Sequence, residues 1–577
     1  MPLDLAINDG LFFDGTGAPG ANKSVGISGG HVVELSDAPL VANETIDARG
    51  RWVMPGFLDM HTHYDAELLA APALTESLRH GVTTVTVGSC SISTILSAAD
   101  DCSDLFTRVE SVPREQVLPL LRSKKTWSTP KDYVAFLKQH PLGANVTAFL
   151  GHSDLRVRVM GLARAVDARA RPSSGELAEM ERWLSDALDV GLLGLSSMTN
   201  PWDKLDGDRH RSAQLPSTYA TWGEYRRLNR VLRARRRILQ SAPNLVTKVN
   251  VLLFLLGSLR GLLSPALRTT LITLADPKAN PGLNRVIGLV TRAFNFLGAN
   301  LRWQTLPVPF EVYADGMELV VFEEFAAGQA ALHLADEGKR TKLLQDPEYR
   351  RAFRKDYAKR FSPRVWHRDF HDSQIVACPD ASVVGRSFGA VADARGVHPV
   401  DAFLDLVVAH GRALRWRMTL ANHRSREVEW MMREPSALIG FADSGAHIRN
   451  MAFYSFPLRM LRVVRDAERS GRPVMPLARA VHRLTGEIAG WLGVEAGTLR
   501  AGDRADVVVV DPSALDDRLD RYHEAPMEGL VGLVRMVNRS DGAVKAVIVN
   551  GRKAFADGAF AEDLGRGAGY GQFLPAR

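Results

Sequence analysis

Residues 54–63 read Met54-Pro55-Gly56-Phe57-Leu58-Asp59-Met60-His61-Thr62-His63, a short apolar run that ends in two histidines two positions apart. The Pro-Gly pair before the run and the polar Asp65 after it place the histidines where a strand ends. Because alternate side chains of a strand share a face, His61 and His63 project the same way. Two such imidazoles can form half of a divalent-metal site, and the alternative is a strand with two satisfied polar histidines.

Downstream of this run, β-branched segments alternate with helical patterns. The strand candidates are residues 81–88, 145–151, 191–197, 237–240, 268–273, 302–308 and 437–442. Helical spacing is clear over residues 174–190 and 399–414. Such alternation is typical of parallel β/α units. With the strand at 54–60 it predicts an α/β fold, a (β/α)8 TIM barrel with its site at the carboxyl ends of the strands.

Both ends of the chain carry short strand patterns. At the N-terminal end these are Leu3–Ile7, Ser24–Ile27, His31–Leu35 and Thr45–Ile46, separated by glycine-containing turns. At the C-terminal end they are residues 503–511 and 544–551. Since neither set alone buries a sheet face, we expect residues 1–53 and 495–577 to form one discontinuous small β-sandwich domain around residues 54–494.

Two stretches interrupt the alternation of strands and helices. Residues 225–237 contain seven arginines, and residues 249–263 are strongly apolar but too short and interrupted to span a bilayer. Together they suggest a membrane-surface patch, but we favour a helix with a solvated basic face followed by a barrel helix. Residues 311–372 look like a helical insertion that covers the site as a lid.

Composition is ordinary for a globular protein of 577 residues, long enough to bury a large core. The net charge of +7 is small for this length and does not favour a nucleic-acid partner. Residues 1–9 lack the pattern of a secretory signal. Three cysteines, Cys90, Cys102 and Cys378, are too few for a disulfide framework. We therefore expect a cytoplasmic protein without a membrane span.

Three motifs in this order, MPGFLDMHTHYD, GVTTVTVGSCSIS and GFADSGAH, resemble the amidohydrolase superfamily. Within it they are most similar to the N-acyl-D-amino-acid deacylases, or D-aminoacylases. The resemblance covers nearly the whole chain, including the strand patterns at both ends. It implies a distorted (β/α)8 barrel, a zinc site and hydrolysis of an amide bond.

The second and third motifs add two candidates to the histidine pair. Cys90 follows the second strand, where a thiolate can ligate zinc; a buried small hydrophobe is the alternative. Many amidohydrolases carry a carboxylated lysine after the fourth strand, but GLLGLSSMTN has no lysine there. Asp443 follows the eighth strand, where a carboxylate can bind metal and move protons; a helix N-cap is the alternative. The predicted metal ligands are thus His61, His63, Cys90 and Asp443, with Asp443 also catalytic.

Four further residues are candidates for substrate binding. His152 and Arg156 end the third strand, in a segment similar to one in the family, and a guanidinium matches a substrate carboxylate well. Lys278 follows the sixth strand, near where the family has a lysine. His447 follows Asp443. For Arg156 a surface loop position is equally plausible, and for His447 a structural one.

The chain departs from the family after strands five and six, where the family supplies one histidine each. Here those exits contain Gln240 and Ser241, and Asp276, and no histidine occurs from residue 211 to 332. Neutral oxygen donors are weak replacements for imidazole. We therefore predict one tightly bound zinc ion rather than two, held by His61, His63 and Asp443 with Cys90 nearby.

These residues predict a metal-dependent amidohydrolase that cleaves a non-peptide C–N bond. The favoured substrate is a small N-acyl-D-amino acid, which carries an amide and a carboxylate. One alternative is a cyclic-amide hydrolase. Another is a barrel that has lost catalysis and only binds a ligand, a reading that the missing histidines favour and the four retained motif residues oppose.

Overall fold

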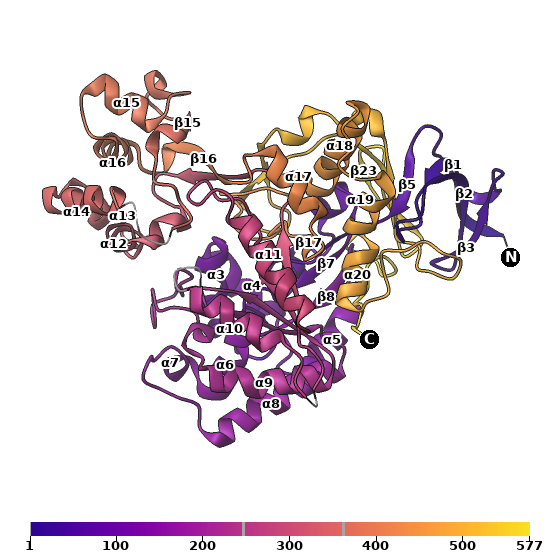
Figure 1. Ribbon diagram of the computed structural model, residues 1–577, viewed down its shortest axis with the longest axis horizontal. Coiled ribbons are helices and arrows are strands. Elements are labelled where there is room, and N and C mark those ends of the chain that lie inside the picture. The colour runs from indigo at the N-terminus through magenta and orange to yellow at the C-terminus, as the bar shows by residue number, and fades with distance from the viewer. Residues whose placement is uncertain (1, 245–247, 263, 360–363) are drawn as a thin grey trace.

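The computed structural model describes residues 2–244, 248–262, 264–359 and 364–577. Its centre is a set of parallel strands in two sheets (Figure 1). One sheet has the order β6 (Phe57–Asp59), β7 (Val82–Val87), β8 (Asn145–Ala148). The other has the order β9 (Leu150–Gly151), β10 (Gly194–Met198), β11 (Ile238–Ala242), β12 (Arg268–Ile272), β13 (Asn300–Thr305), β17 (Ala437–Ile439). Each predicted central strand is therefore confirmed to within a few residues.

The two parallel sheets are joined at both edges. Only Phe149 separates β8 from β9, so the chain passes directly from one sheet into the other. At the opposite edge, the Met60 amide donates to the Gly440 carbonyl at 2.9 Å, and Thr62 bridges Ser444 in parallel. The carboxyl ends of β6 and β17 therefore lie next to each other, although almost 400 residues separate them.

Helices follow the central strands and cover them. They include α3 (Ala99–Glu110), α4 (Arg114–Lys124), α5 (Pro130–Gln139), α6 (His152–Met160), α8 (Ser174–Asp189), α9 (Trp222–Ala234), α10 (Lys248–Ser258), α11 (Leu283–Phe296), α17 (Ser425–Arg433) and α18 (Phe456–Arg469). The helix predicted at 174–190 is α8, and it begins with a capping box between Ser173 and Glu176. Apolar side chains of these helices and strands share one core.

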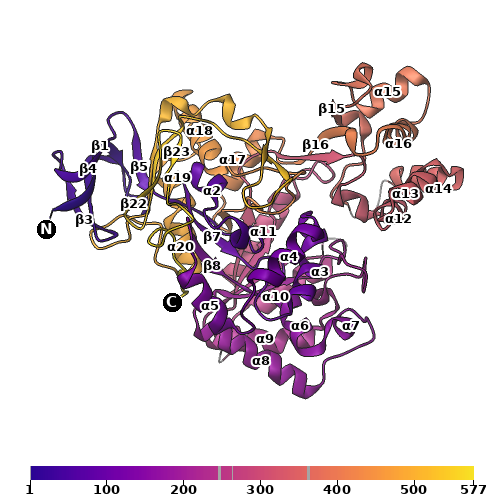
Figure 2. The same cartoon turned by 180° about the vertical axis from the view of Figure 1, so that it is seen from behind.

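Strands from both ends of the chain pair in one sheet (Figure 2). Its path is β23 (Ala559–Phe560), β22 (Arg552–Ala556), β21 (Val544–Val549), β18 (Val507–Val510), β5 (Trp52–Pro55), β1 (Leu3–Phe12), β2 (Ala21–Ser28), β3 (His31–Ser36), with β4 (Ala42–Asp47) on β1. The C-terminal β18 pairs antiparallel with the N-terminal β5. Gly56 then leads from β5 into β6, and a Cβ there would lie 2.1 Å from Thr83 Oγ1.

Residues 310–421 form a lobe with its own core, at the upper left of Figure 1. The lobe contains β14 (Phe310–Asp315), β15 (Gln374–Ala377), β16 (Arg415–Ala421), α12 (Ala326–Leu332), α13 (Glu337–Gln345), α14 (Pro347–Tyr357), α15 (Phe388–Arg395) and α16 (Pro399–His410). The helical insertion expected at 311–372 is therefore too short, and its three-stranded sheet was not foreseen. The helical spacing over 399–414 predicts correctly that one face of α16 is buried. It does not predict that this face packs against lobe residues such as Trp416.

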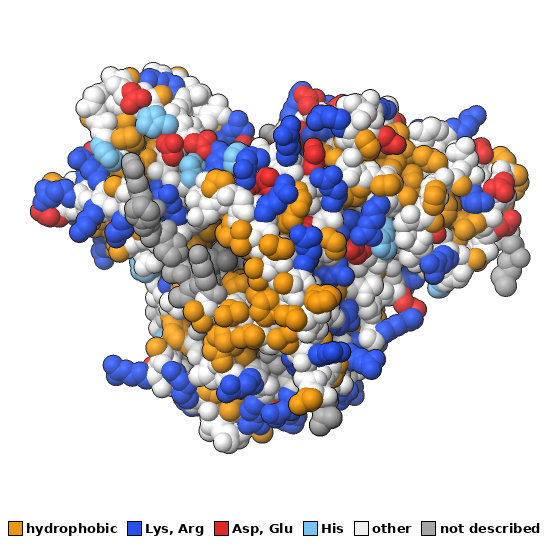
Figure 3. Space-filling view, in the orientation of Figure 1, with side chains coloured by type: hydrophobic (Ala, Val, Ile, Leu, Met, Phe, Trp, Pro, Cys, Tyr) orange, Lys and Arg blue, Asp and Glu red, His pale blue; other side chains and the backbone are white. Residues whose placement is uncertain are grey.

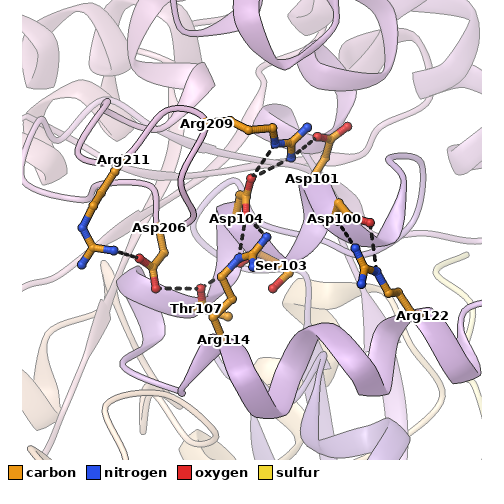
Figure 4. Close-up of polar contacts among 10 residues, drawn as sticks. All are labelled: Asp100, Asp101, Ser103, Asp104, Thr107, Arg114, Arg122, Asp206, Arg209 and Arg211. Carbon is orange, nitrogen blue, oxygen red and sulfur yellow. Dashed lines mark hydrogen bonds and ion pairs between the residues drawn. The ribbon is translucent and has the colours of Figure 1, made fainter. Parts of the chain in front are cut away.

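An ion-pair cluster fastens the loop after β10 to α3 (Figure 4). Asp104 of α3, with a side chain 1% exposed, lies 2.9 Å from the Arg114 guanidinium and 2.7 Å from that of Arg209. Gly207 passes so close that a Cβ would lie 2.3 Å from Asp104 Oδ1. Since β10 and β7 both end at the edge that carries the metal-ligand candidates, this cluster stabilises the scaffold of that edge.

Candidate metal centre and active site

The four predicted metal ligands lie at the carboxyl ends of three strands. His61 and His63 follow β6, Cys90 follows β7 and Asp443 follows β17. Nitrogen atoms of both imidazoles and the Cys90 thiol lie within 4.8 Å of one another. The histidines therefore project to the same side, as their spacing predicts. No other such group of three occurs in the part of the chain that the structure describes.

The carboxylate of Asp443 faces both histidines. Its Oδ1 lies 3.0 Å from His63 Nε2 and 3.6 Å from His61 Nε2. Cys90 Sγ lies 3.2 Å from His61 Nε2. Two imidazole nitrogens, a sulfur and a carboxylate are a donor set that zinc accepts, and separations of this size suit ligands around one ion. The residues therefore fit a divalent metal such as zinc.

Two glutamine amides surround the far side of the His61 ring. His61 Nδ1 donates to Gln304 Oε1 at 2.6 Å, and Gln240 Nε2 lies 2.9 Å from the same nitrogen. Gln240 Oε1 also accepts from the Cys90 amide at 3.2 Å. With Nδ1 occupied, the His61 lone pair lies on Nε2, which faces Cys90 and Asp443. Such outer hydrogen bonds orient metal-binding imidazoles.

Protonation of the centre also suits metal binding. Burial lowers the pKa of His61 to about 4, so the ring is neutral at pH 7 and can donate its lone pair. Burial alone would raise the pKa of Asp443, but the hydrogen bond from His63 and the charges of His63 and His447 outweigh it. The pKa of Asp443 therefore lies below its usual value, and the carboxylate is ionised.

Four residues at the centre have a left-handed backbone. Cys90, Ser91, Asp443 and His447 have φ values of 51°, 72°, 57° and 48°, in the left-handed region that side chains other than glycine rarely adopt. Gly445 has a φ of 88°, and a Cβ there would lie 2.8 Å from the His63 backbone. Such conformations persist where the surrounding structure fixes them, and they are common at functional sites.

His152 and Arg156 lie in a separate buried network. His152 Nε2 lies 2.7 Å from Glu224 Oε1, and Arg156 pairs with the second oxygen of the same carboxylate. Burial opposes ionisation of Glu224, but His152 and Arg156 outweigh it and hold its pKa below the usual value. Since Arg156 is fully buried and already has a carboxylate partner, it is not on a surface loop. The network joins the Cys90 loop through Ser91 and Ser153, whose hydroxyls lie 2.8 Å apart.

The other two substrate-binding candidates are differently placed. His447 lies at the centre: its Nε2 is 3.8 Å from Asp443 Oδ2, and its side chain is 17% exposed. Lys278 follows β12 and pairs with Asp372 of the lobe, which also contacts His367 at 2.8 Å. The structure therefore brings His447, but not Lys278, into contact with Asp443.

Two residues of these networks, Gln304 and Glu224, are not among those predicted from the sequence. Gln304 stands near the end of β13 in Trp303-Gln304-Thr305, where a polar residue in a buried strand is a recognisable signal. Glu224 lies in the first turn of α9, where it reads as an ordinary helix-start carboxylate. Only the packing of α9 against α6 reveals its partners.

No helix within the described residues is long and apolar enough to cross a membrane.

Comparison with known proteins identifies relatives along the whole chain. Residues 44–218 match the amidohydrolase family. An uncharacterized protein of Mycobacterium tuberculosis is 52% identical over 99% of this chain and 94% of its own. The N-acyl-D-glutamate deacylase of Alcaligenes xylosoxydans is 34% identical, but over 34% of this chain and 37% of its own length.

Solved structures show the same fold. A D-aminoacylase structure superposes with a TM-score of 0.64 and 21% identity over 100% of both chains. The N-acyl-D-glutamate deacylase from Bordetella bronchiseptica, complexed with zinc and a phosphonate inhibitor, gives a TM-score of 0.65 and 23% identity over 100% of both chains. The motifs, the family match and the fold agree: this chain belongs to the amidohydrolase family and is D-aminoacylase-like.

Proposed function

We propose that the chain is a metal-dependent amidohydrolase that cleaves the amide C–N bond of an N-acyl-D-amino acid. The observation that carries the proposal is the convergence of His61, His63, Cys90 and Asp443 at the carboxyl ends of the strands. Relatives named N-acyl-D-glutamate deacylase and D-aminoacylase, each matching about a third of this chain, support the choice of substrate class.

We infer that one zinc ion is held by His61 Nε2, His63 Nε2 and Asp443, with Cys90 Sγ beside it. When bound, zinc would polarise the substrate carbonyl and lower the pKa of the attacking water. No histidine follows strands five and six, and Gln240, at the end of strand five, contacts the inner nitrogen of His61 instead. Neutral amides bind zinc weakly, which supports one tight site rather than two.

Asp443 is the proton carrier in this proposal. Its ionised carboxylate can accept a proton from the attacking water and deliver it to the leaving nitrogen. The fixed backbone of Asp443 holds the carboxylate next to both histidines, so no rearrangement is needed before the proton moves. His447 is partly exposed beside Asp443 and is our candidate for contact with the substrate.

The remaining candidates have weaker support. Lys278 is 18% exposed at its side chain and would have to leave Asp372 to bind a substrate carboxylate. His152 and Arg156 would act by supporting the loop of Cys90 rather than by touching substrate. A cyclic-amide substrate is the alternative within the same chemistry.

We also interpret the parallel strands as a distorted (β/α)8 barrel over residues 54–494, with a discontinuous small β-domain from residues 1–53 and 495–577. The hydrogen bond between Met60 and Gly440 supports closure of the barrel. The pairing of β18 with β5 supports one terminal domain.

The test is a screen of N-acetyl and N-formyl D- and L-amino acids with zinc added, monitoring release of the amine. We expect turnover of at least one D-amino acid derivative, none by the metal-free protein, and turnover lower by about two orders of magnitude or more for Asp443→Asn. Zinc binding without turnover of any acyl amino acid or cyclic amide would instead favour a barrel that only binds a ligand.

A further inference from the structure

The outward face of two neighbouring helices is apolar. On α10 it comprises Val249, Leu252 and Leu256, which are 61%, 46% and 47% exposed. On α11 it comprises Val286, Leu289 and Phe296, which are 58%, 63% and 89% exposed. Each set follows helical spacing, so each helix carries a second apolar stripe that faces away from the core. We call these six side chains the apolar face.

The two helices form one continuous surface. The Arg260 amide, just after α10, donates to the Gly298 carbonyl, just after α11, at 3.0 Å. The Asn300 amide donates to Ser258 Oγ, also at 3.0 Å. In Figure 3 the hydrophobic side chains gather over the position of α10 and α11, with Lys and Arg side chains around them. Contiguous exposed apolar surface of this kind marks an interaction site.

The same part of the chain is strongly basic. Residues 225–310 contain fourteen lysines and arginines and a single acidic residue, Asp276, a net charge of +13 against +7 for the whole chain. The remainder of the protein is therefore net acidic, at −6. On α9, which is next to α10, Arg226 and Arg230 are exposed. Arg233 donates to the Leu259 carbonyl at 2.9 Å, so α9 is fastened to the end of α10.

A barrel helix that packs on the strands, as predicted for α10, has one apolar side, but α10 has two. Phe254 and Leu255 are buried, and the Phe254 ring contacts Trp222 and Tyr225 of α9. The opposite side, however, carries no charge among Val249, Leu252 and Leu256. Solvation of such a surface is unfavourable at roughly 25 cal/mol for each Å² of apolar area.

We propose that the apolar face and the arginines around it form a docking surface for an anionic lipid membrane. Helices that lie on a membrane bury Leu and Phe below the headgroups and place Lys or Arg at the anionic surface. Arginine side chains at the margin of the face can extend their guanidinium groups toward lipid phosphates. The protein would rest on the bilayer through α10 and α11 without crossing it.

Charge argues against a second copy of this chain as the partner. Six of the fourteen basic residues pair with acidic residues outside the segment, for example Arg285 with Glu427. Among the described residues, Arg226, Arg230 and Arg236 have no acidic partner, and two copies joined through this face would bring these arginines together. Asp276, the only acidic residue of the segment, is buried and paired with Arg424.

The experiment is co-sedimentation of the full-length protein with vesicles. One set contains phosphatidylcholine alone, and the other contains about one third phosphatidylserine. We expect binding to the anionic vesicles at least tenfold stronger than to the neutral ones, and weaker at high salt. The double substitution Leu289→Gln with Phe296→Gln should reduce binding at least tenfold. The double substitution Arg230→Gln with Arg236→Gln should reduce it by about fivefold for each arginine.

Matched controls change equally exposed side chains elsewhere. Val41→Gln with Val531→Gln removes two apolar side chains that are 91% and 87% exposed in other parts of the chain. Arg500→Gln with Arg566→Gln removes two exposed arginines outside the basic segment. These controls should bind like the unmodified protein, and circular dichroism should show that every variant is folded.

Three outcomes would overturn the proposal. The protein could stay in the supernatant with both kinds of vesicle. The controls could lose as much binding as the apolar-face variant, which would make the effect non-specific. Light scattering could show a dimer that Leu289→Gln with Phe296→Gln dissociates while vesicles are not bound, which would assign the face to a second copy.

Discussion

At the scale of single residues, the proposed metal centre is organised around His61 and the two glutamine amides behind it. Cys90, Asp443 and His63 surround the outer side of this imidazole, and Gln304 accepts from its inner nitrogen. The family's histidines after strands five and six are absent, and an amide from Gln240 stands at the end of strand five. The question that this arrangement raises is therefore whether the remaining ligands can hold one metal ion or two.

Titration of the metal-free protein with zinc should give one tight site per chain. His63→Ala should abolish it, because a nitrogen donor is lost and the remaining groups cannot offset the lost hydration of the ion. Gln304→Leu should weaken zinc binding by about 10–100-fold, since outer hydrogen bonds orient the ligand. Calorimetry measures both, and His31→Asn, at an exposed position, is the control. Two tight sites in the unmodified protein would contradict the expectation.

Asp443→Asn should leave the protein folded and lower turnover by about two orders of magnitude or more. An amide has nearly the shape of the carboxylate but cannot accept the proton of the attacking water. Turnover is measured on a substrate found by the screen, and zinc content is measured on the same sample. A variant that keeps its zinc and near-normal turnover would remove the proton-carrier role.

Much of this centre could be predicted because its residues stand in short local motifs. His61 and His63 are two apart on one strand, and Cys90 and Asp443 each directly follow a strand. Gln304 and Glu224 could not be assigned, because their roles come from contacts with residues 243 and 72 positions away. Spacing in the sequence contains no information about such pairs.

At the scale of elements, α3 and the loop after β10 depend on one buried carboxylate. Asp104→Asn should lower the free energy of unfolding by about 1–3 kcal/mol, because two guanidinium groups lose their buried ionic acceptor. Asp100→Asn removes a neighbouring pair with Arg122 in which the side chains are 42% and 59% exposed. Such a surface pair contributes about 0–1 kcal/mol, so this variant is the control. Equal urea midpoints for the two variants would contradict the prediction.

In the lobe, Glu324 should make stability depend on pH. Burial raises its pKa to about 7, from an ordinary value of 4.5. Between these two pH values the folded chain binds more protons than the unfolded chain. The contribution of Glu324 to the free energy of unfolding therefore falls as the pH rises, and it is constant above about pH 7. The change is of order 3 kcal/mol. The variant Glu324→Gln should lack it, because an amide stays neutral and can still accept from the Val365 and Trp366 amides.

Urea midpoints of the unmodified protein and Glu324→Gln at pH 5, 6 and 7 measure this difference. Parallel pH profiles for the two proteins would show that Glu324 is ionised in the folded lobe throughout this range.

The periodicity of the sequence predicted where strands and helices lie. It did not predict whether a helix belongs to the lobe or to the strand-bearing core. The alternation of short β-branched runs with helices placed the parallel strands correctly. The extent of the lobe was missed because α16 has the same apolar periodicity as a barrel helix. Periodicity indicates that a face is buried, and the identity of the covering residues depends on tertiary packing.

At the scale of the whole molecule, the lobe and the strand-bearing core have separate apolar cores. They are joined where the chain crosses between them and by ion pairs such as Arg108 with Glu323 and Arg449 with Asp315. The lobe begins and ends in an antiparallel pair in which Phe310 is opposite Ala421. Below this pair, the Asn422 side chain donates to the carbonyls of Leu306 and Val308 at 2.9 and 3.2 Å. The chain therefore enters and leaves the lobe at one point.

This junction predicts that the lobe can be excised. Replacing residues 311–420 by a short glycine linker joins two Cα atoms only about 5 Å apart, as in any antiparallel pair. The shortened chain should fold and bind one zinc ion with unchanged affinity, because His61, His63, Cys90 and Asp443 all follow strands of the core. It should lose the contact of Lys278 with Asp372.

If the lobe covers the site, KM for the acyl amino acid should rise while zinc affinity does not. Calorimetric titration and circular dichroism test the claim, and a shortened chain that unfolds or loses zinc would show that lobe and core form one cooperative unit.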